Sequence, residues 1–72
     1  MTAQEFQDWM DEAGIRYAAD IVRAVGCART SAEVMMRQAA AGEDVPVKRS
    51  MALAMAAVAA GLRPWGNGKE EA

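Results

Sequence analysis

The sequence has no histidine and only one cysteine, Cys27, among its 72 residues. Without histidine there is no histidine-based acid–base pair and no familiar zinc site, and one cysteine supplies at most one thiolate ligand. A single cysteine also excludes an intrachain disulfide, which fits a reducing compartment. The glycines are isolated and form no phosphate-binding loop. We therefore expect no enzymatic activity, no cofactor and no metal, with Cys27 a small buried side chain.

Long apolar runs and a secretory leader are missing as well. The longest apolar run, 51–62, is far shorter than the ~20 residues that a helix needs to cross a bilayer. The N-terminal segment carries Glu5 and Asp8 at positions where a secretory signal would be basic. We expect a cytoplasmic protein without a membrane partner.

The residues that are present favour helices throughout. The chain is 53% hydrophobic and 25% charged, as in ordinary globular domains, and it is very rich in alanine, the strongest helix former. No segment alternates apolar and polar residues with the period of two that marks a strand. We predict an all-α domain of four short helices over residues 1–65, followed by a flexible tail over 66–72.

Isolated glycines divide the chain into helix-period segments. Each of four glycines follows such a segment, where glycine is the usual C-terminal stop of a helix: Gly14, Gly26, Gly42 and Gly61. Thr2 and Glu5 form a capping box at the start of the first helix. The apolar residues of this helix, spaced three and four apart, are Phe6, Trp9, Met10 and Ala13.

The other three helices are predicted from the same rhythm. The second spans 15–25, with an inward stripe of Ile15, Ala18, Ala19, Val22 and Val25. The third spans 31–41 behind a capping box of Thr30 and Glu33, with an inward stripe of Ala32, Met35, Met36, Ala39 and Ala40. The fourth takes Pro46 into its first turn, runs to Ala60 and is apolar almost all round.

This order of pieces resembles the small Cro/repressor-like helix-turn-helix (XRE-type) proteins of phages and mobile elements. The resemblance covers residues 6–65 and rests on Phe6-x-x-Trp9, the stops at Gly14 and Gly26, Arg29-Thr30-Ser31, the link from Gly42 to Pro46, and the run from Met51 to Trp65. It implies a sequence-specific DNA-binding regulator, often dimeric, that acts as a repressor and reads the major groove with helix 31–41.

Several residues depart from the family pattern. Val22 stands four residues before the turn glycine, where a small residue is usual, and the segment from Gly14 to Gly26 is one residue longer than typical. Methionines, Met35 and Met36, replace the common aromatic of the third helix. A helix-turn-helix-derived protein that binds and inhibits a host protein is therefore the alternative function.

The third helix carries the main candidates for DNA contact. Arg29, Glu33 and Arg37 lie four apart on one face, opposite the methionines, and an arginine at the helix start could bind guanine through two hydrogen bonds. The same spacing equally fits ion pairs on a solvated face. All candidate DNA-binding residues, with those flanking this helix, are Arg16, Tyr17, Arg29, Thr30, Ser31, Glu33, Arg37, Lys48 and Arg49.

The net charge of −2 is distributed unevenly. Residues 1–12 hold four carboxylates, which could engage a basic partner or form a solvated face. Residues 13–63 hold seven cations against four carboxylates, a net charge of +3. DNA-binding proteins need positive charge only on the side that faces DNA, so this distribution permits binding to double-stranded DNA.

The fourth helix is too apolar to be exposed on every side. Either it lies at the centre of the domain, or its spare face pairs with a second copy. The candidate residues of a homodimer interface are Met51, Ala52, Met55, Ala56 and Ala59. The methionines could also form an adaptable protein-binding groove, although methionine at helical spacing is more often core filler.

Overall fold

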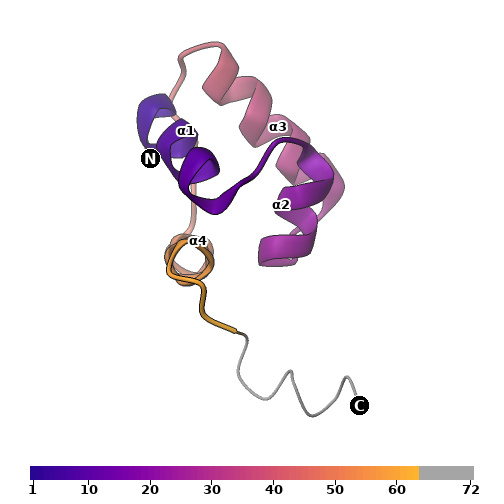
Figure 1. Cartoon of the computed structure of the whole chain (residues 1–72). Helices are drawn as coiled ribbons and strands as arrows, with labels where there is room; N and C mark the ends of the chain where they lie inside the picture. Colours follow the sequence, from indigo (N-terminus) through magenta and orange to yellow (C-terminus); the bar gives the residue numbers. More distant parts are fainter. Residues whose placement is uncertain (64–72) are drawn as a thin grey trace.

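A computed structural model describes residues 1–63, which form four α-helices and, within that range, no strand. The helices are α1 (Ala3–Ala13), α2 (Ala18–Val25), α3 (Arg29–Ala40) and α4 (Arg49–Ala59) (Figure 1). The all-α prediction is thus confirmed. No helix of this part of the chain has the length and apolar character needed to cross a membrane. The predicted domain end at residue 65 and the predicted tail over 66–72 lie outside the described residues.

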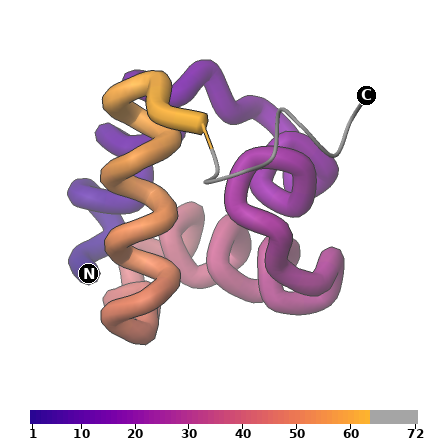
Figure 2. Tube along the Cα trace, turned by 90° about the horizontal axis from the view of Figure 1, so that it is seen from below, coloured from indigo at the N-terminus to yellow at the C-terminus, as the bar shows by residue number. Residues whose placement is uncertain are grey.

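Helices α1 and α2 link α3 to α4. α1 and α2 each pack against both α3 and α4, whereas α3 and α4 do not pack directly against each other. In Figure 1, α3 runs across the top of the molecule and α4 is viewed nearly along its axis; Figure 2 shows α4 along its length. The position of α3 relative to α4 therefore depends on the contacts that α1 and α2 make with both.

The core contains side chains from all four helices and from two connecting segments. Its buried members are Phe6, Trp9, Ile15, Ile21, Ala32, Met35, Ala39, Val45 and Met55. The rings of Phe6 and Trp9 lie with their centroids 5.7 Å apart, tilted by 46°, a favourable arrangement for aromatic pairs. The predicted stripes are confirmed at Phe6 and Trp9 of the first helix and at Ala32, Met35 and Ala39 of the third. Ala40 was predicted to face inward and is exposed, because it lies in the last turn of α3. Ile21 and Val45 were absent from the predicted stripes.

Two side chains of α1 bind main-chain oxygens of its neighbours. The indole Nε1 of Trp9 donates a buried hydrogen bond to the carbonyl oxygen of Met55 in α4, at 2.8 Å. The amide Nε2 of Gln7 donates to the carbonyl oxygen of Ala39 in α3, at 3.0 Å. Ala39 belongs to the last turn of α3, where carbonyls lack partners within the helix. α1 thus binds both helices through directional contacts in addition to apolar packing.

The predicted beginning of α1 and the four predicted glycine stops are confirmed. The Thr2 hydroxyl accepts from the Glu5 backbone N–H at 3.1 Å, and the Glu5 carboxylate accepts from that of Thr2 at 2.8 Å. All four glycines have positive φ. Gly26 begins the three-residue turn between α2 and α3 and has a φ of 76°. This left-handed conformation is unfavourable for any residue that carries a Cβ. Glycine there sets the direction in which α3 leaves α2.

α2 is shorter than the predicted helix over 15–25, because it begins at Ala18. Ile15 follows the left-handed Gly14 and is buried in the connecting segment, where its N–H donates to the Met10 carbonyl oxygen at 2.8 Å. Starting at Ala18 places Ile21 in the core. The predicted helix start at Ile15 was wrong because burial of an apolar side chain does not distinguish a helical residue from a residue of the connecting segment.

α3 begins at Arg29, two residues before the predicted start, and ends at Ala40. The capping residue is Ala28, which has no side chain that can cap, so the predicted box of Thr30 and Glu33 does not form. Thr30 is the second residue of the helix, and Glu33 instead pairs with Arg29. At the beginning of α3, Glu33 therefore makes an ion pair along the helix instead of the predicted capping bond.

α4 begins at Arg49, so the prediction that Pro46 belongs to its first turn was wrong. The segment before the helix contributes to the core, because Val45 is fully buried. The N–H of Val45 donates a hydrogen bond to the Met1 carbonyl oxygen at 2.7 Å. This long-range bond ties the α3–α4 connection to the N-terminus. Pro46 itself is exposed.

Replacing Trp9 with phenylalanine should destabilise the fold by about 2–3 kcal/mol. The change removes a buried hydrogen bond, worth ~1 kcal/mol, and leaves part of the indole volume empty, with a further cost of ~1–2 kcal/mol. Urea unfolding followed by far-ultraviolet circular dichroism measures the difference. Tyr17→Phe, at a side chain that is 69% exposed, is the control and should leave stability unchanged. Equal stability of Trp9→Phe and the wild type would contradict the importance of this contact.

Candidate nucleic-acid interface

The outer face of α3 is free of contacts with the other helices. Ala32, Met35 and Ala39 turn inward and are buried, which fixes the rotation of the helix about its axis. The opposite side of the helix is exposed, and it carries Arg29, Thr30, Glu33 and Arg37. The structure therefore brings these four predicted residues together on one solvent-facing surface, which we call the α3 outer face.

The charges of the α3 outer face are only partly paired. Nε of Arg29 lies 3.3 Å from Oε2 of Glu33, and the two side chains are 67% and 54% exposed. Exposed pairs of this kind contribute at most ~1 kcal/mol. Arg37 has no ion-pair partner among residues 1–63. The alternative interpretation, ion pairing on a solvated face, thus holds for Arg29 and Glu33, and the pair is weak enough to open.

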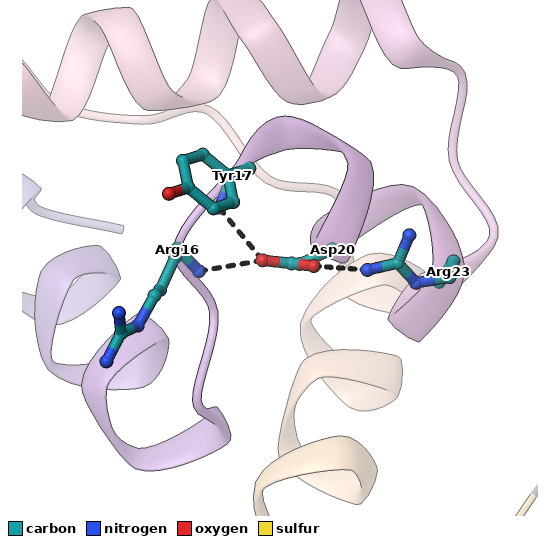
Figure 3. A network of polar contacts seen from close by, with 4 residues as sticks. All are labelled: Arg16, Tyr17, Asp20 and Arg23. Carbon is teal, nitrogen blue, oxygen red and sulfur yellow. Dashed lines mark hydrogen bonds and ion pairs between the residues drawn. The ribbon is translucent and has the colours of Figure 1, made fainter.

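A carboxylate organises the chain just before α2 (Figure 3). Oδ2 of Asp20 accepts hydrogen bonds from the backbone N–H groups of Arg16 and Tyr17, both at 3.0 Å. Oδ1 of the same residue binds the guanidinium of Arg23. The backbone N–H of Arg16, followed by that of Tyr17, lowers the pKa of Asp20, because both donors favour the charged carboxylate. Asp20 thereby holds the backbone from which two candidate DNA-binding side chains project.

The side chains of Arg16 and Tyr17 extend from this segment into solvent. Both are exposed, and Figure 3 shows the guanidinium and the phenol ring pointing in different directions. Their backbone is fixed by Asp20, whereas neither side chain is bound by another residue of the described part. Both are available to an external partner, and they do not form one joint site.

A groove of about 440 Å³ lies beside the α3 outer face, where α3 and the beginning of α4 diverge. Thr30 and Ser31 from α3 share this groove with Lys48, so the structure brings these three candidates together. Arg49, next to Lys48, is exposed but does not line it. The apolar part of the groove includes Val34, Met35, Val47 and Met51, of which the sequence indicated the two methionines as candidates for a binding groove.

The predicted dimer residues of the fourth helix do not share one exposed face. Met55 is only 2% exposed and belongs to the core, and Met51 lines the groove. Ala52 and Ala59 are half-buried, and only Ala56 is exposed. The face of α4 that is open to solvent instead contains Leu53, which is 60% exposed, Ala56 and Ala60. Sequence reasoning chose the wrong side because apolar residues surround this helix.

The acidic residues of α1 make only local hydrogen bonds in the described part of the chain: Glu5 accepts from the Thr2 N–H, and Asp8 accepts from the Gln4 side-chain amide. The four carboxylates of α1, at Glu5, Asp8, Asp11 and Glu12, are exposed, as expected for a solvated face. Cys27 is a free, half-buried thiol in the turn before α3. Within residues 1–63, no group of three or more potential ligands could hold a metal ion.

Comparisons with protein-family models, with curated proteins and with solved structures found no match to this chain. The candidate interface is therefore defined by its own geometry: an exposed helical face with guanidinium and hydroxyl groups, beside a groove that Lys48 lines.

Replacing Asp20 with asparagine should reduce both stability and its dependence on acid. The folded protein holds the pKa of Asp20 below the ordinary value of 3.8, so the unfolded chain binds a proton first as pH falls. This contribution to stability is present above pH ~4 and is lost as the pH falls through the lowered pKa. Urea unfolding at a series of pH values should show a smaller acid loss for Asp20→Asn than for the wild type. Asp11→Asn, the same change at an exposed carboxylate of α1 whose side chain accepts no hydrogen bond within residues 1–63, is the control, and parallel curves for Asp20→Asn and the wild type would contradict the role of Asp20.

Proposed function

We propose that this protein is a small, non-enzymatic DNA-binding transcriptional regulator, a repressor of the phage or mobile-element type. In this proposal α2, the turn from Gly26 to Ala28 and α3 act as a helix-turn-helix, and α3 enters the major groove. The observation that carries the proposal is the α3 outer face, with Arg29, Thr30, Glu33 and Arg37 exposed opposite a buried face. Access to DNA would place the protein in the cytoplasm.

The dimensions and chemistry of α3 suit this role. Twelve residues give a helix about 18 Å long, and a single helix fits the ~12 Å width of the major groove. Guanidinium groups can bind guanine through two hydrogen bonds, and the Thr30 hydroxyl can bind a base edge or a phosphate. Glu33 can accept from the amino group of cytosine or orient Arg29, to which it is already paired.

Four exposed residues outside α3 would position the protein on the phosphate backbone. Arg16 and Tyr17 precede α2, and Lys48 and Arg49 begin α4; all four side chains are exposed. Phosphate contacts set register and orientation and make binding depend on salt. The carboxylates of residues 1–12 belong to another helix, α1, so they do not dilute the charge of the α3 outer face.

Replacing Arg29 or Arg37 with alanine should weaken sequence-selective binding about tenfold each, since a bidentate arginine contact discriminates bases by ~1–3 kcal/mol. The DNA would be a duplex enriched by the wild-type protein from a random library, together with the DNA upstream of its own gene. Fluorescence anisotropy at two salt concentrations gives the affinity and its salt slope.

Arg63→Ala is the matched control, because it removes the same charge from an exposed residue beyond the end of α4. It should change the affinity less than about twofold, as expected for a distant, screened charge. If no duplex is enriched, or if the variants at Arg29 and Arg37 bind like Arg63→Ala, the proposal fails.

We also propose that two copies bind DNA together through the outer face of α4. Leu53, Ala56 and Ala60 form an apolar exposed surface there, with the exposed Arg49 and Arg63 at its two ends, so the contact between two copies would use the apolar residues. The helix is about 16 Å long, and a strip ~10 Å wide covers ~160 Å², far less than the ~800 Å² per partner of a stable complex. The dimer is therefore expected on DNA, with a monomer in free solution.

Replacing Leu53 with glutamate should abolish cooperative binding of the second copy to a duplex with two half-sites and leave binding to one half-site unchanged. A buried carboxylate facing its own copy is repelled and loses hydration. Analytical ultracentrifugation of the free protein and its DNA complexes measures the stoichiometry. Gln4→Glu adds the same charge on α1 and should keep the cooperativity. Cooperative binding by Leu53→Glu would contradict this interface.

A further inference from the structure

The groove between α3 and α4 is a second surface, and it exists because these two helices do not pack against each other. We propose that this groove binds an acidic amphipathic helix of a partner protein, with two apolar side chains of that helix inserted between α3 and the beginning of α4. This inference does not depend on DNA binding.

The size and lining of the groove fit apolar side chains. Its volume of about 440 Å³ lies within the ~300–1,000 Å³ typical of binding clefts. Val34 and Met35 of α3 face Val47 and Met51 across it. Methionine adapts to different apolar partners because its side chain is unbranched and polarizable. A phosphate backbone would gain little from such walls, so nucleic acid is a poor occupant of the groove.

The length of the groove indicates a helix. Its α3 wall extends over the nine residues from Thr30 to Gln38, about 12 Å along the axis, which equals roughly two turns of a bound helix. Two turns present apolar anchors at positions i and i+4, the usual pattern when a helix occupies a groove. The groove is open to solvent, whereas pockets for small molecules bury most of the ligand surface.

The charge of the rim selects an acidic partner. Lys48 lines the groove, Arg49 follows it in the sequence, and no carboxylate belongs to the lining. The remaining polar lining is uncharged: Thr30, Ser31, Gln38 and Ser50. A helix with carboxylates beside its apolar anchors would therefore meet positive charge and hydrogen-bonding groups at the rim.

A second copy of this chain does not offer such a helix within residues 1–63. The exposed side of α1 carries four carboxylates but no exposed large apolar side chain. The outer face of α4 has Leu53 but no carboxylate. Neither of these two helices combines the two features, and the proposed occupant is a helix of a different protein.

The test uses a synthetic, fluorescein-labelled helical peptide of about 14 residues, or four turns, built from alanine and glutamate with two leucines four positions apart. One control peptide places the same leucines two positions apart, on opposite sides of the helix. A second replaces each glutamate with lysine. Anisotropy measures the affinity, and NMR of methionine methyl groups in the labelled full-length protein locates the contact.

The first peptide should bind at least about fivefold more tightly than either control, the ratio expected for losing one anchor or reversing the charge at the rim. Its binding should shift the methyl signals of Met35 and Met51 and leave that of Met10 unchanged. Lys48→Glu should weaken binding about fivefold, whereas Arg63→Glu, the same charge change at the far end of α4, should not. Equal binding of the three peptides, no binding, or methyl shifts outside the groove would overturn the proposal.

Discussion

The hydrogen bond from the Trp9 indole to the Met55 carbonyl oxygen joins the first helix to the last across 46 residues. It lies in the core beside Phe6, and it fixes where α4 passes α1. Gln7, two residues earlier, binds the end of α3 in the same way. Because α3 and α4 do not pack on each other, the relative position of these helices depends on α1 and α2.

This arrangement has direct consequences for both proposed surfaces. Helices that diverge leave a groove between them, and a helix held only from its inner side leaves its outer side free. The α3 outer face and the groove are therefore products of the same packing. They share Thr30 at the beginning of α3, so DNA and a partner helix would compete if both bind. Such competition would allow a protein partner to release the regulator from DNA.

Prediction from the sequence succeeded where neighbouring residues alone determine the local structure. Thr2 and Glu5 predicted the beginning of α1, and Gly26 predicted the end of α2, because capping and left-handed geometry depend on neighbouring residues alone. The positions of Phe6 and Trp9 in the core followed from helical spacing. The same reasoning placed Arg29, Glu33 and Arg37 together on an exposed side of α3.

Among the predictions that were wrong, the capping box of Thr30 and Glu33 failed locally, because α3 begins at Arg29, and others depended on long-range contacts. Val45 is drawn into the core and bonded to Met1, so α4 begins later than Pro46 suggested. In α4 nearly every residue is apolar, so its contacts with α1 and α2 decide which side is buried and leave Leu53 exposed. The sequence suggested a groove lined by methionines, but its position between α3 and α4 could not be predicted, since it arises from a helix pair that does not pack.

The central claim is that the α3 outer face binds DNA, and an amide NMR titration tests it most directly. Uniformly labelled full-length protein would be titrated with the enriched duplex and with an unrelated duplex of equal length. The account predicts that the enriched duplex causes the largest shifts at Arg29, Thr30, Glu33 and Arg37, with smaller shifts at the beginnings of α2 and α4. Shifts confined to α1 or to the outer face of α4, or the same response to both duplexes, would contradict it.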